Sequence, residues 1–176
     1  MSSLKSYLLD TNIYIQSWNL WHPKSVFPGY WEWMLHEHKI KQFQTIDKVL
    51  EELKHYDGIE EWKNQIKEVS TKTTDNIVDP LRTVLQVVYN HTSQGKKYTQ
   101  RAITEFENCA DSYLIAYALA NHLDIVTEET FEERCLKRIK IPNICRKLNI
   151  RTLTLPQLLR EVNPEFLWNG NKATTP

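Results

Sequence analysis

Four short apolar runs along the chain alternate with longer segments in which apolar residues recur at helical spacing. The runs lie at residues 4–9, 41–46, 123–127 and 150–155, and their shortness predicts buried β-strands. The longer segments predict helices near 13–19, 31–35, 47–56, 59–66, 80–88, 99–108, 111–120, 142–149 and 156–162. Strands that alternate with helices are typical of a parallel sheet, so we expect an α/β fold built from βαβ units.

Two helix starts and one further strand are suggested by local signals. Asp47 is expected to cap the helix that follows it, because Asp is favoured at helix N-termini. The pair Asp79-Pro80 indicates another start, with Pro at the first helical position. The polar connection before it contains a short apolar stretch, which predicts an edge strand at 76–78.

The segment between Trp18 and Trp33 is rich in aromatic residues. Such rings could stack on unpaired nucleic-acid bases, but Trp and Tyr are also ordinary core residues. The spacing of Trp31, Met34 and Leu35 matches one apolar helix face. Core packing is therefore the favoured interpretation.

Length and composition indicate a single domain, which we place at residues 1–165, with a polar tail at 166–176. The chain has 176 residues, of which 41% are hydrophobic, enough to form a core. Lys plus Arg and Asp plus Glu both number 22, so net charge favours neither nucleic acid nor membranes. The apolar runs are too short for a signal peptide or a membrane span. Three cysteines without paired spacing indicate buried thiols in a reducing cytoplasm rather than disulfides or zinc.

Four acidic residues occupy positions where chemistry is expected. Asp10 directly follows the first apolar run, and Glu129 closely follows the third; the ends of parallel strands line ligand crevices. Asp111 opens the buried face of its helix, and Glu52 lies at the margin of another buried face. A structural alternative remains open, because Asp10 or Asn12 could cap one helix and Asp111 another.

Convergence of these acids would create a cation site. Right-handed crossovers gather strand ends along one edge of a sheet. Clustered carboxylates repel one another unless cations neutralise them, and hard oxygen ligands favour Mg²⁺ or Mn²⁺. Two such ions can activate a water and stabilise the leaving oxygen of a phosphodiester.

The motifs that carry these acids resemble the PIN-domain nucleases, which include the VapC-type toxins of bacterial toxin–antitoxin pairs. The resemblance covers residues 4–162 and rests on four motifs: DTN at 10–12, VLEEL at 49–53, ADSYLIAYA at 110–118 and IVTEE at 125–129. The stretches PGYWEWM, ADSYLIAYA and IKIPNIC look like a PIN-like branch catalogued only as a domain of unknown function.

This resemblance implies a three-layer α/β/α sandwich with a central, mostly parallel sheet and a metal-dependent endoribonuclease site. Asp10, Glu52, Asp111 and Glu129 match the family's four acids, and Asn12 and Thr127 match its supporting polar residues. By the same resemblance, Asp10, Asp111 and Glu129 are expected to bind Mg²⁺ or Mn²⁺, with Glu52 as a ligand or water-positioning group. Glu129 departs from the commoner Asp and lengthens that ligand by one methylene.

Basic residues follow the last acid and suggest an RNA-binding face. The stretch 134–151 contains no acid, and the residues expected to contact RNA are Lys137, Arg138, Lys140, Arg146 and Lys147. An ordinary solvated basic face is the competing interpretation.

The partners expected from these features are RNA, a small antitoxin protein and, as an open possibility, a second copy of the chain in a homodimer. One alternative is a catalytically silent PIN-like module that binds protein or RNA. Another is a haloacid-dehalogenase-like phosphatase, which would also use an Asp after the first strand. That class needs a second Asp two residues later, where this chain has Asn12.

Overall fold

A parallel four-stranded sheet forms the centre of the molecule. The computed structural model describes residues 5–56, 58–71, 77–93 and 95–167. The strands are β1 (Tyr7–Leu9), β2 (Phe43–Gln44), β3 (Asp124–Val126) and β4 (Thr152–Leu153), in the spatial order β2-β1-β3-β4. All three strand pairs are parallel. The predicted α/β class is therefore confirmed.

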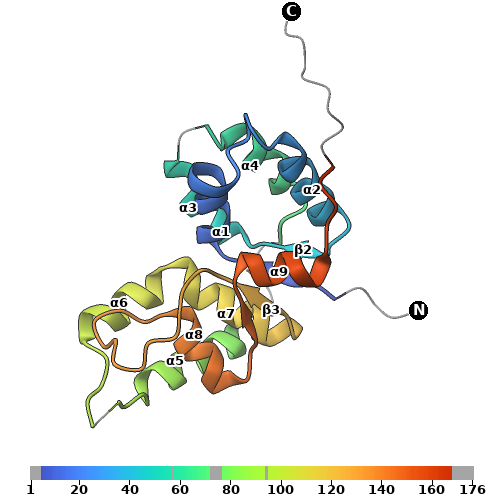
Figure 1. The fold of residues 1–176 in the computed structure, drawn as a ribbon. Helices are drawn as coiled ribbons and strands as arrows, with labels where there is room; N and C mark the ends of the chain where they lie inside the picture. Colours follow the sequence, from blue (N-terminus) through green and yellow to red (C-terminus); the bar gives the residue numbers. More distant parts are fainter. Residues whose placement is uncertain (1–4, 57, 72–76, 94, 168–176) are drawn as a thin grey trace, which may run out of the picture.

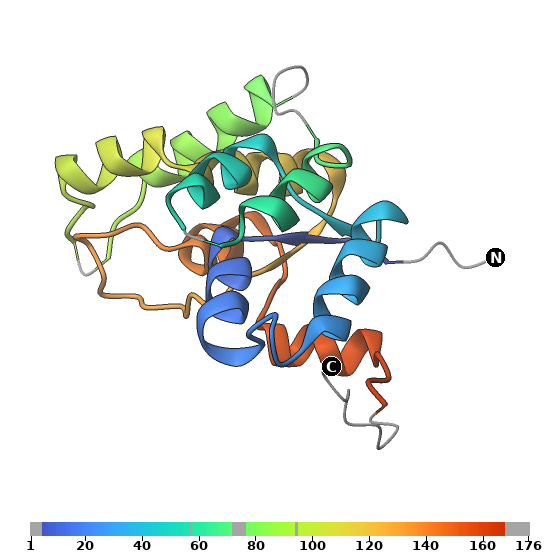
Figure 2. The same ribbon diagram turned by 90° about the horizontal axis from the view of Figure 1, so that it is seen from above.

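Helices cover both faces of this sheet, as the three-layer prediction requires (Figures 1 and 2). In Figure 2, α1 and α9 lie on one side of β1, and α5, α6 and α7 lie on the other. The helices are α1 (Thr11–Gln16), α2 (Pro28–Lys39), α3 (Asp47–Glu52), α4 (Glu60–Lys67), α5 (Val78–Tyr89), α6 (Gln100–Asn108), α7 (Ala110–Asn121), α8 (Ile141–Cys145) and α9 (Leu155–Val162). A π-helical segment spans Ser17–Trp21, and 3₁₀ turns span Leu53–His55 and Arg146–Leu148.

The core explains why the short apolar runs became strands. Leu8 and Leu9 of β1 and Ile125 and Val126 of β3 are all fully buried, although successive side chains point to opposite faces. A strand buried on both faces must have a layer of helices on each side. These runs are continuous rather than alternating in polarity because the sheet is covered twice.

Two details at helix starts differ from the sequence prediction. Residue 46 is the N-cap of α3 and Asp47 is its first helical residue, so Asp47 does not cap the helix. Helix α5 begins at Val78, which puts Pro80 at the third helical position rather than the first. Proline is tolerated there because the N–H groups of a first turn have no partner within the helix.

The expected edge strand at 76–78 is not formed in the described part of the segment. Residue 76 lies outside the described residues, Ile77 is the N-cap of α5, and Val78 belongs to the helix. The edge next to β2 is instead extended by a single parallel bridge between Ile46 and Thr71. The apolar residues at 77–78 therefore begin a helix instead of forming a strand.

The aromatic residues of α2 pack in the core as predicted, whereas two aromatic residues of the segment before α2 are exposed. Trp31 and Met34 are buried, while Leu35 is partly buried against the core. Trp21 and Phe27, in contrast, are more than one-third exposed.

Of the cysteines, Cys145 is buried but Cys109 and Cys135 are partly accessible, so the expectation of three buried thiols is wrong for two of them.

The domain continues slightly beyond its predicted end at residue 165. Phe166 packs with its ring against Tyr30 and Trp33, so contacts with the domain extend to residue 166. Residues 168–176 of the predicted tail lie outside the described part. Within the described residues, every helix is too short or too polar to cross a lipid bilayer.

Candidate functional site

The predicted acids meet near the point where the sheet changes its winding direction. From β1 the chain crosses to β2 on one side, and the later chain returns to β3 on the other side of β1. In such sheets the crevice outside the carboxyl ends of these two strands is the usual ligand site. Asp10 follows β1 and Thr127 follows β3, so both residues lie at that crevice.

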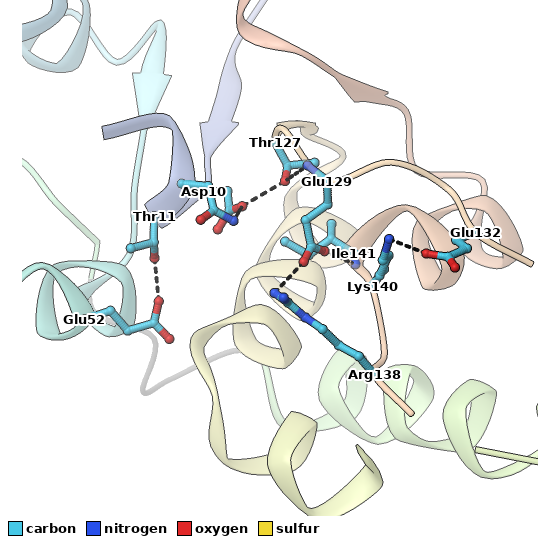
Figure 3. Close-up of polar contacts among 10 residues, drawn as sticks. Asp10, Thr11, Glu52, Thr127, Glu129, Glu132, Arg138, Lys140 and Ile141 are labelled. Carbon is cyan, nitrogen blue, oxygen red and sulfur yellow. Dashed lines mark hydrogen bonds and ion pairs between the residues drawn. The ribbon is translucent and has the colours of Figure 1, made fainter. Parts of the chain in front are cut away.

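Asp10 occupies the N-cap position of α1, but two other side chains hold its carboxylate, which does not cap the helix. Its residue is only 2% exposed, and its carboxylate makes no capping hydrogen bond to α1. The Oδ2 atom accepts hydrogen bonds from Thr127 Oγ1 at 2.8 Å and Asn12 Nδ2 at 3.1 Å. Thr127 and Asn12 therefore fix the orientation of the Asp10 carboxylate. Figure 3 shows Thr127 beside Asp10.

Asn12 also bears on the phosphatase alternative. A dehalogenase-like enzyme needs a titratable acid and base at this position, but the Asn12 amide donates to Asp10 and does not titrate. The local geometry thus gives that reaction class no proton donor two residues after Asp10.

Asp111 is the least compensated of the four acids. It stands at the second position of α7, two residues after the N-cap residue Cys109. Among the described residues, no group donates a hydrogen bond to its carboxylate, and it does not cap the helix. Burial is the main cause that raises the pKa of Asp111 well above its usual value, and the charges of Asp10, Glu129 and Glu52 raise it further.

Glu52 links three elements of the site. From the end of α3, its Oε2 accepts a hydrogen bond from Thr11 Oγ1 at 2.6 Å, and its Oε1 accepts one from the Ala110 backbone N–H at 3.2 Å. It thereby satisfies a backbone donor at the start of α7, where no N-cap side chain does so. Glu52 thus holds the turn that carries Asp111.

Glu129 is turned toward a different set of partners. Its Oε1 accepts a hydrogen bond from Arg138 Nη2 at 2.7 Å, and its Oε2 accepts one from the Ile141 backbone N–H at 2.8 Å (Figure 3). The Glu129 N–H in turn donates to Thr127 Oγ1 at 3.1 Å. Glu129 therefore stands beside the other acids, with both its carboxylate oxygens engaged.

Burial of the site shows in the pKa of Asp10. Burial raises it from 3.8 to about 6; the charge of Glu129 adds to the rise, and the Thr127 and Asn12 hydrogen bonds oppose it. A change of this size corresponds to roughly 3 kcal/mol of preference for the protonated form. Arg138 is the group that partly offsets the repulsion at Asp111.

A cavity of about 580 Å³ gives access to three of the acids. Its lining includes Asp10, Glu52 and Asp111, together with Asn12 and Arg138. Cys109 also lines it, but burial raises the pKa of its thiol to about 12, which makes a thiolate nucleophile unfavourable. The cavity is thus a polar cleft lined by carboxylates.

The acids fit a divalent cation in part. In the described part of the chain, no three His, Cys, Asp or Glu side chains are arranged to hold an ion together. Asp111, however, offers a buried carboxylate without a hydrogen-bond donor, beside the oriented Asp10, which is the hard oxygen chemistry that Mg²⁺ and Mn²⁺ prefer. Asp10 and Asp111 therefore fit such an ion, while Glu129 is engaged by Arg138.

The basic residues predicted to contact RNA divide into two kinds. Arg138 pairs with Glu129, and Lys140 pairs with Glu132 at 2.6 Å. For Lys137, Arg146 and Lys147, no carboxylate partner is found within the described ranges. RNA contact by any of the five stays a prediction.

The sequence analysis missed one site residue, Thr11, and gave another, Arg138, only an RNA-binding role. Thr11 forms the hydrogen bond that fixes Glu52, and its position next to Asp10 was the available signal. Arg138 was assigned to RNA alone, although its guanidinium contacts Glu129 and lines the acidic cavity. Its pairing depends on the path of the loop from Thr127 to Lys140, which no local pattern encodes.

Comparison with known proteins adds a family but little else. A family model described as "Domain of unknown function (DUF4411)" matches residues 7–166. No curated protein matches the chain significantly. A similar solved structure is "Crystal structure of VapBC2 from Rickettsia felis bound to a DNA fragment from their promoter", with 16% identity, a TM-score of 0.44 and coverage of 84% of this chain and 97% of that chain. At this identity and TM-score, the similarity transfers no property of that complex to the present chain.

Proposed function

The chain belongs to the family described as a domain of unknown function, DUF4411, and we propose that it is a metal-dependent endoribonuclease. The observation that carries this proposal is the pair of buried carboxylates, Asp10 and Asp111, which face one cleft with raised pKa values. Such a pair is costly to fold unless a cation or a proton neutralises it. The motifs around the pair resemble those of PIN-domain nucleases.

Each residue of the site has a distinct role in this proposal. Asp10 and Asp111 would hold a Mg²⁺ or Mn²⁺ ion, which when bound supplies an activated water and neutralises charge on the leaving oxygen. Thr127 and Asn12 keep the Asp10 carboxylate oriented. Glu52 holds the N-terminal turn of α7 in place through Ala110, as a positioning residue.

Glu129 and Arg138 are proposed to act together. Arg138 is exposed on the loop and lines the acidic cleft, so it can contact a phosphate of the RNA backbone. Movement of Arg138 toward a phosphate would release Oε1 of Glu129. Glu129 would then complete the acidic cluster as a further oxygen ligand.

We also propose that the nuclease is the toxin of a type II toxin–antitoxin pair. This proposal rests on the resemblance of the sequence motifs to VapC-type nucleases. It predicts that a small protein encoded next to this chain co-purifies with it and inhibits its cleavage of RNA. A neighbouring protein that neither binds nor inhibits would leave a processing nuclease as the function.

Cleavage of RNA tests the enzymatic proposal. A mixed pool of structured and single-stranded RNA is incubated with Mg²⁺ or Mn²⁺ and either the wild type, Asp111→Asn or Asp79→Asn. Asp79 is an exposed carboxylate of α5 and serves as a matched control. We expect cuts that require the metal, persist in Asp79→Asn and disappear in Asp111→Asn.

Two observations favour a second candidate function, an RNA-binding module without catalysis. Both oxygens of Glu129 are engaged, and no three-residue metal cluster exists among the described residues. This alternative predicts RNA binding that is indifferent to Mg²⁺ and to Asp111→Asn, with no cleavage by the wild type.

A further inference from the structure

A second cavity, of about 440 Å³, lies beside α8 and the loop that follows β3. Its lining includes His91 and Ser93 from the segment after α5, Phe131 from the loop, and Asn143, Arg146 and Lys147 from α8 and its 3₁₀ turn. The lining thus combines a histidine, an aromatic ring and two cations. This combination differs from the acidic cleft and from the apolar core.

His91 is the unusual residue of this cavity. It is only 6% exposed, and its ring stacks on Tyr98 with centroids 4.3 Å apart. Within the described chain, both of its ring nitrogens are buried and neither has a hydrogen-bond partner, so a ligand reaches them only if side chains of the cavity wall shift. Burial, followed by the charge of Lys147, lowers the pKa of His91, so the neutral ring presents one donor and one acceptor. A buried polar ring of this kind is costly unless a ligand pairs with it.

The cations of the cavity are available for a ligand. Arg146 and Lys147 are exposed, and neither pairs with a carboxylate in the part of the chain that the structure describes. The Arg146 guanidinium lies over the Phe131 ring, 4.7 Å from its centroid. Phe131 itself is 46% exposed. One carboxylate, Glu133, also lines the cavity and limits its positive charge.

The same loop connects this cavity to the acidic cleft. Glu129 faces the acids, and Phe131, two residues later, lines the second cavity. Asn143 holds the loop here, because its Oδ1 accepts from the Glu132 N–H at 3.0 Å and its Nδ2 donates to the Glu132 carbonyl at 2.8 Å. Figure 3 shows Glu129 and Glu132 on this loop, each bound to a basic side chain.

We propose that the second cavity binds one nucleotide of a single-stranded RNA. Its phosphate contacts Arg146 and Lys147, its base stacks on the Arg146–Phe131 pair, and the base edge pairs with the ring nitrogens of His91. Unpaired bases are recognised by stacking on aromatic rings and guanidinium planes together with hydrogen bonds to their edges. The identification of the ligand as RNA rests on the proposed nuclease function. The site deepens that function, since it would hold the strand while a neighbouring phosphate reaches the acids.

The charge part of the proposal is tested by RNA affinity and its salt dependence. A fluorescent single-stranded oligoribonucleotide is titrated by anisotropy into the full chain carrying Asp111→Asn, so that the RNA stays intact. The test variant adds Arg146→Ala and Lys147→Ala; the control adds Lys39→Ala and Lys67→Ala, two exposed lysines of α2 and α4. We expect the test variant to bind at least tenfold more weakly, with a salt slope smaller by about 1.4, from about 0.7 per lost phosphate contact. Equal affinity and slope in both variants would overturn the proposal.

The base-recognition part is tested at Phe131 and His91. Phe131→Ala is expected to weaken binding roughly tenfold, as the loss of one stacked base does. His91→Phe keeps a ring against Tyr98 but removes both nitrogens, and we expect weaker binding together with a thermal midpoint that is not lowered, since two buried nitrogens without partners are lost. In the ¹⁵N spectrum of histidine-labelled protein, AMP, UMP and the RNA should each shift the His91 signals. Inorganic phosphate that shifts them as strongly would reduce the site to an anion site and contradict base recognition.

The two proposals fail in distinguishable ways. Metal-dependent cleavage by the wild type, combined with unchanged affinity in the Arg146, Lys147, Phe131 and His91 variants, would sustain the nuclease and reject this site. Binding of RNA that is lost in these variants, combined with no cleavage by the wild type, would sustain the site and reject the nuclease.

Discussion

Replacing Asp10 by Asn should stabilise the metal-free protein at neutral pH. Asn has nearly the same size, and its carbonyl oxygen can accept both hydrogen bonds that Asp10 Oδ2 receives from Thr127 and Asn12. The substitution therefore removes a buried charge while it keeps these two hydrogen bonds. An ordinary structural acid would behave in the opposite way.

The size of the effect follows from the pKa of Asp10. Because the pKa is about 6 in the folded chain and 3.8 as the ordinary value, the folded state binds more protons than the unfolded state between these two values. The protonated Asp10 side chain therefore contributes stability that is fully present below pH 3.8 and is lost as the pH rises through 6. At pH 7 the charged Asp10 costs roughly 3 kcal/mol, so we expect Asp10→Asn to gain about 1 to 3 kcal/mol there and almost nothing at pH 4.

Urea unfolding measures this difference directly. The wild type, Asp10→Asn and the exposed control Asp79→Asn are unfolded at pH 4 and pH 7 in EDTA. Since Asp79 forms a surface ion pair with Arg82, its loss should change the unfolding free energy by about 0.5 kcal/mol or less. Destabilisation by Asp10→Asn of equal size at both pH values would show that the Asp10 charge is already compensated, and would refute the reasoning.

Four further predictions concern single elements of the site and core. Mg²⁺ at a hundredfold excess over its Kd should stabilise the wild type by about 2.7 kcal/mol in thermal melts, and it should not stabilise Asp111→Asn. Glu52→Ala should cost about 1 to 3 kcal/mol in urea unfolding because it leaves a buried backbone donor of α7 without a partner, whereas Glu52→Gln should cost less. Arg138→Gln should tighten Mn²⁺ binding in calorimetry, because it releases Glu129 and removes a positive charge; unchanged affinity would argue against their coupling. Trp31→Ala should cost about 3 to 5 kcal/mol in urea unfolding, since the ring is fully buried.

The sequence predicted the parallel sheet because its strands are buried on both faces. A run such as the one at 7–9 has no alternation, is too short for a helix and therefore admits few interpretations. The stretch at 77–78 is also apolar, but it became the start of α5. There the helix extends two residues before Pro80. Proline is tolerated at the third helical position because an N–H in the first turn has no partner within the helix.

The acidic site was predictable only in outline. Asp10 and Asp111 could be placed because each stands at the boundary of a strongly patterned element. The pairing of Arg138 with Glu129 could not be predicted, since it depends on a loop whose path is fixed by Asn143, a residue with no local signal for this role. Hydrogen bonds of this kind determine which charged side chains lie close together, and the spacing of residues along the chain does not predict them.

The most direct test of the central claim is a Mn²⁺ titration followed by electron paramagnetic resonance. The claim is that Asp10 and Asp111 together form a site for a divalent cation. We predict that the wild type and Asp79→Asn bind Mn²⁺ with the same affinity, and that Asp10→Asn and Asp111→Asn each lose this binding. Equal binding by all four proteins, or none by the wild type, would contradict the account.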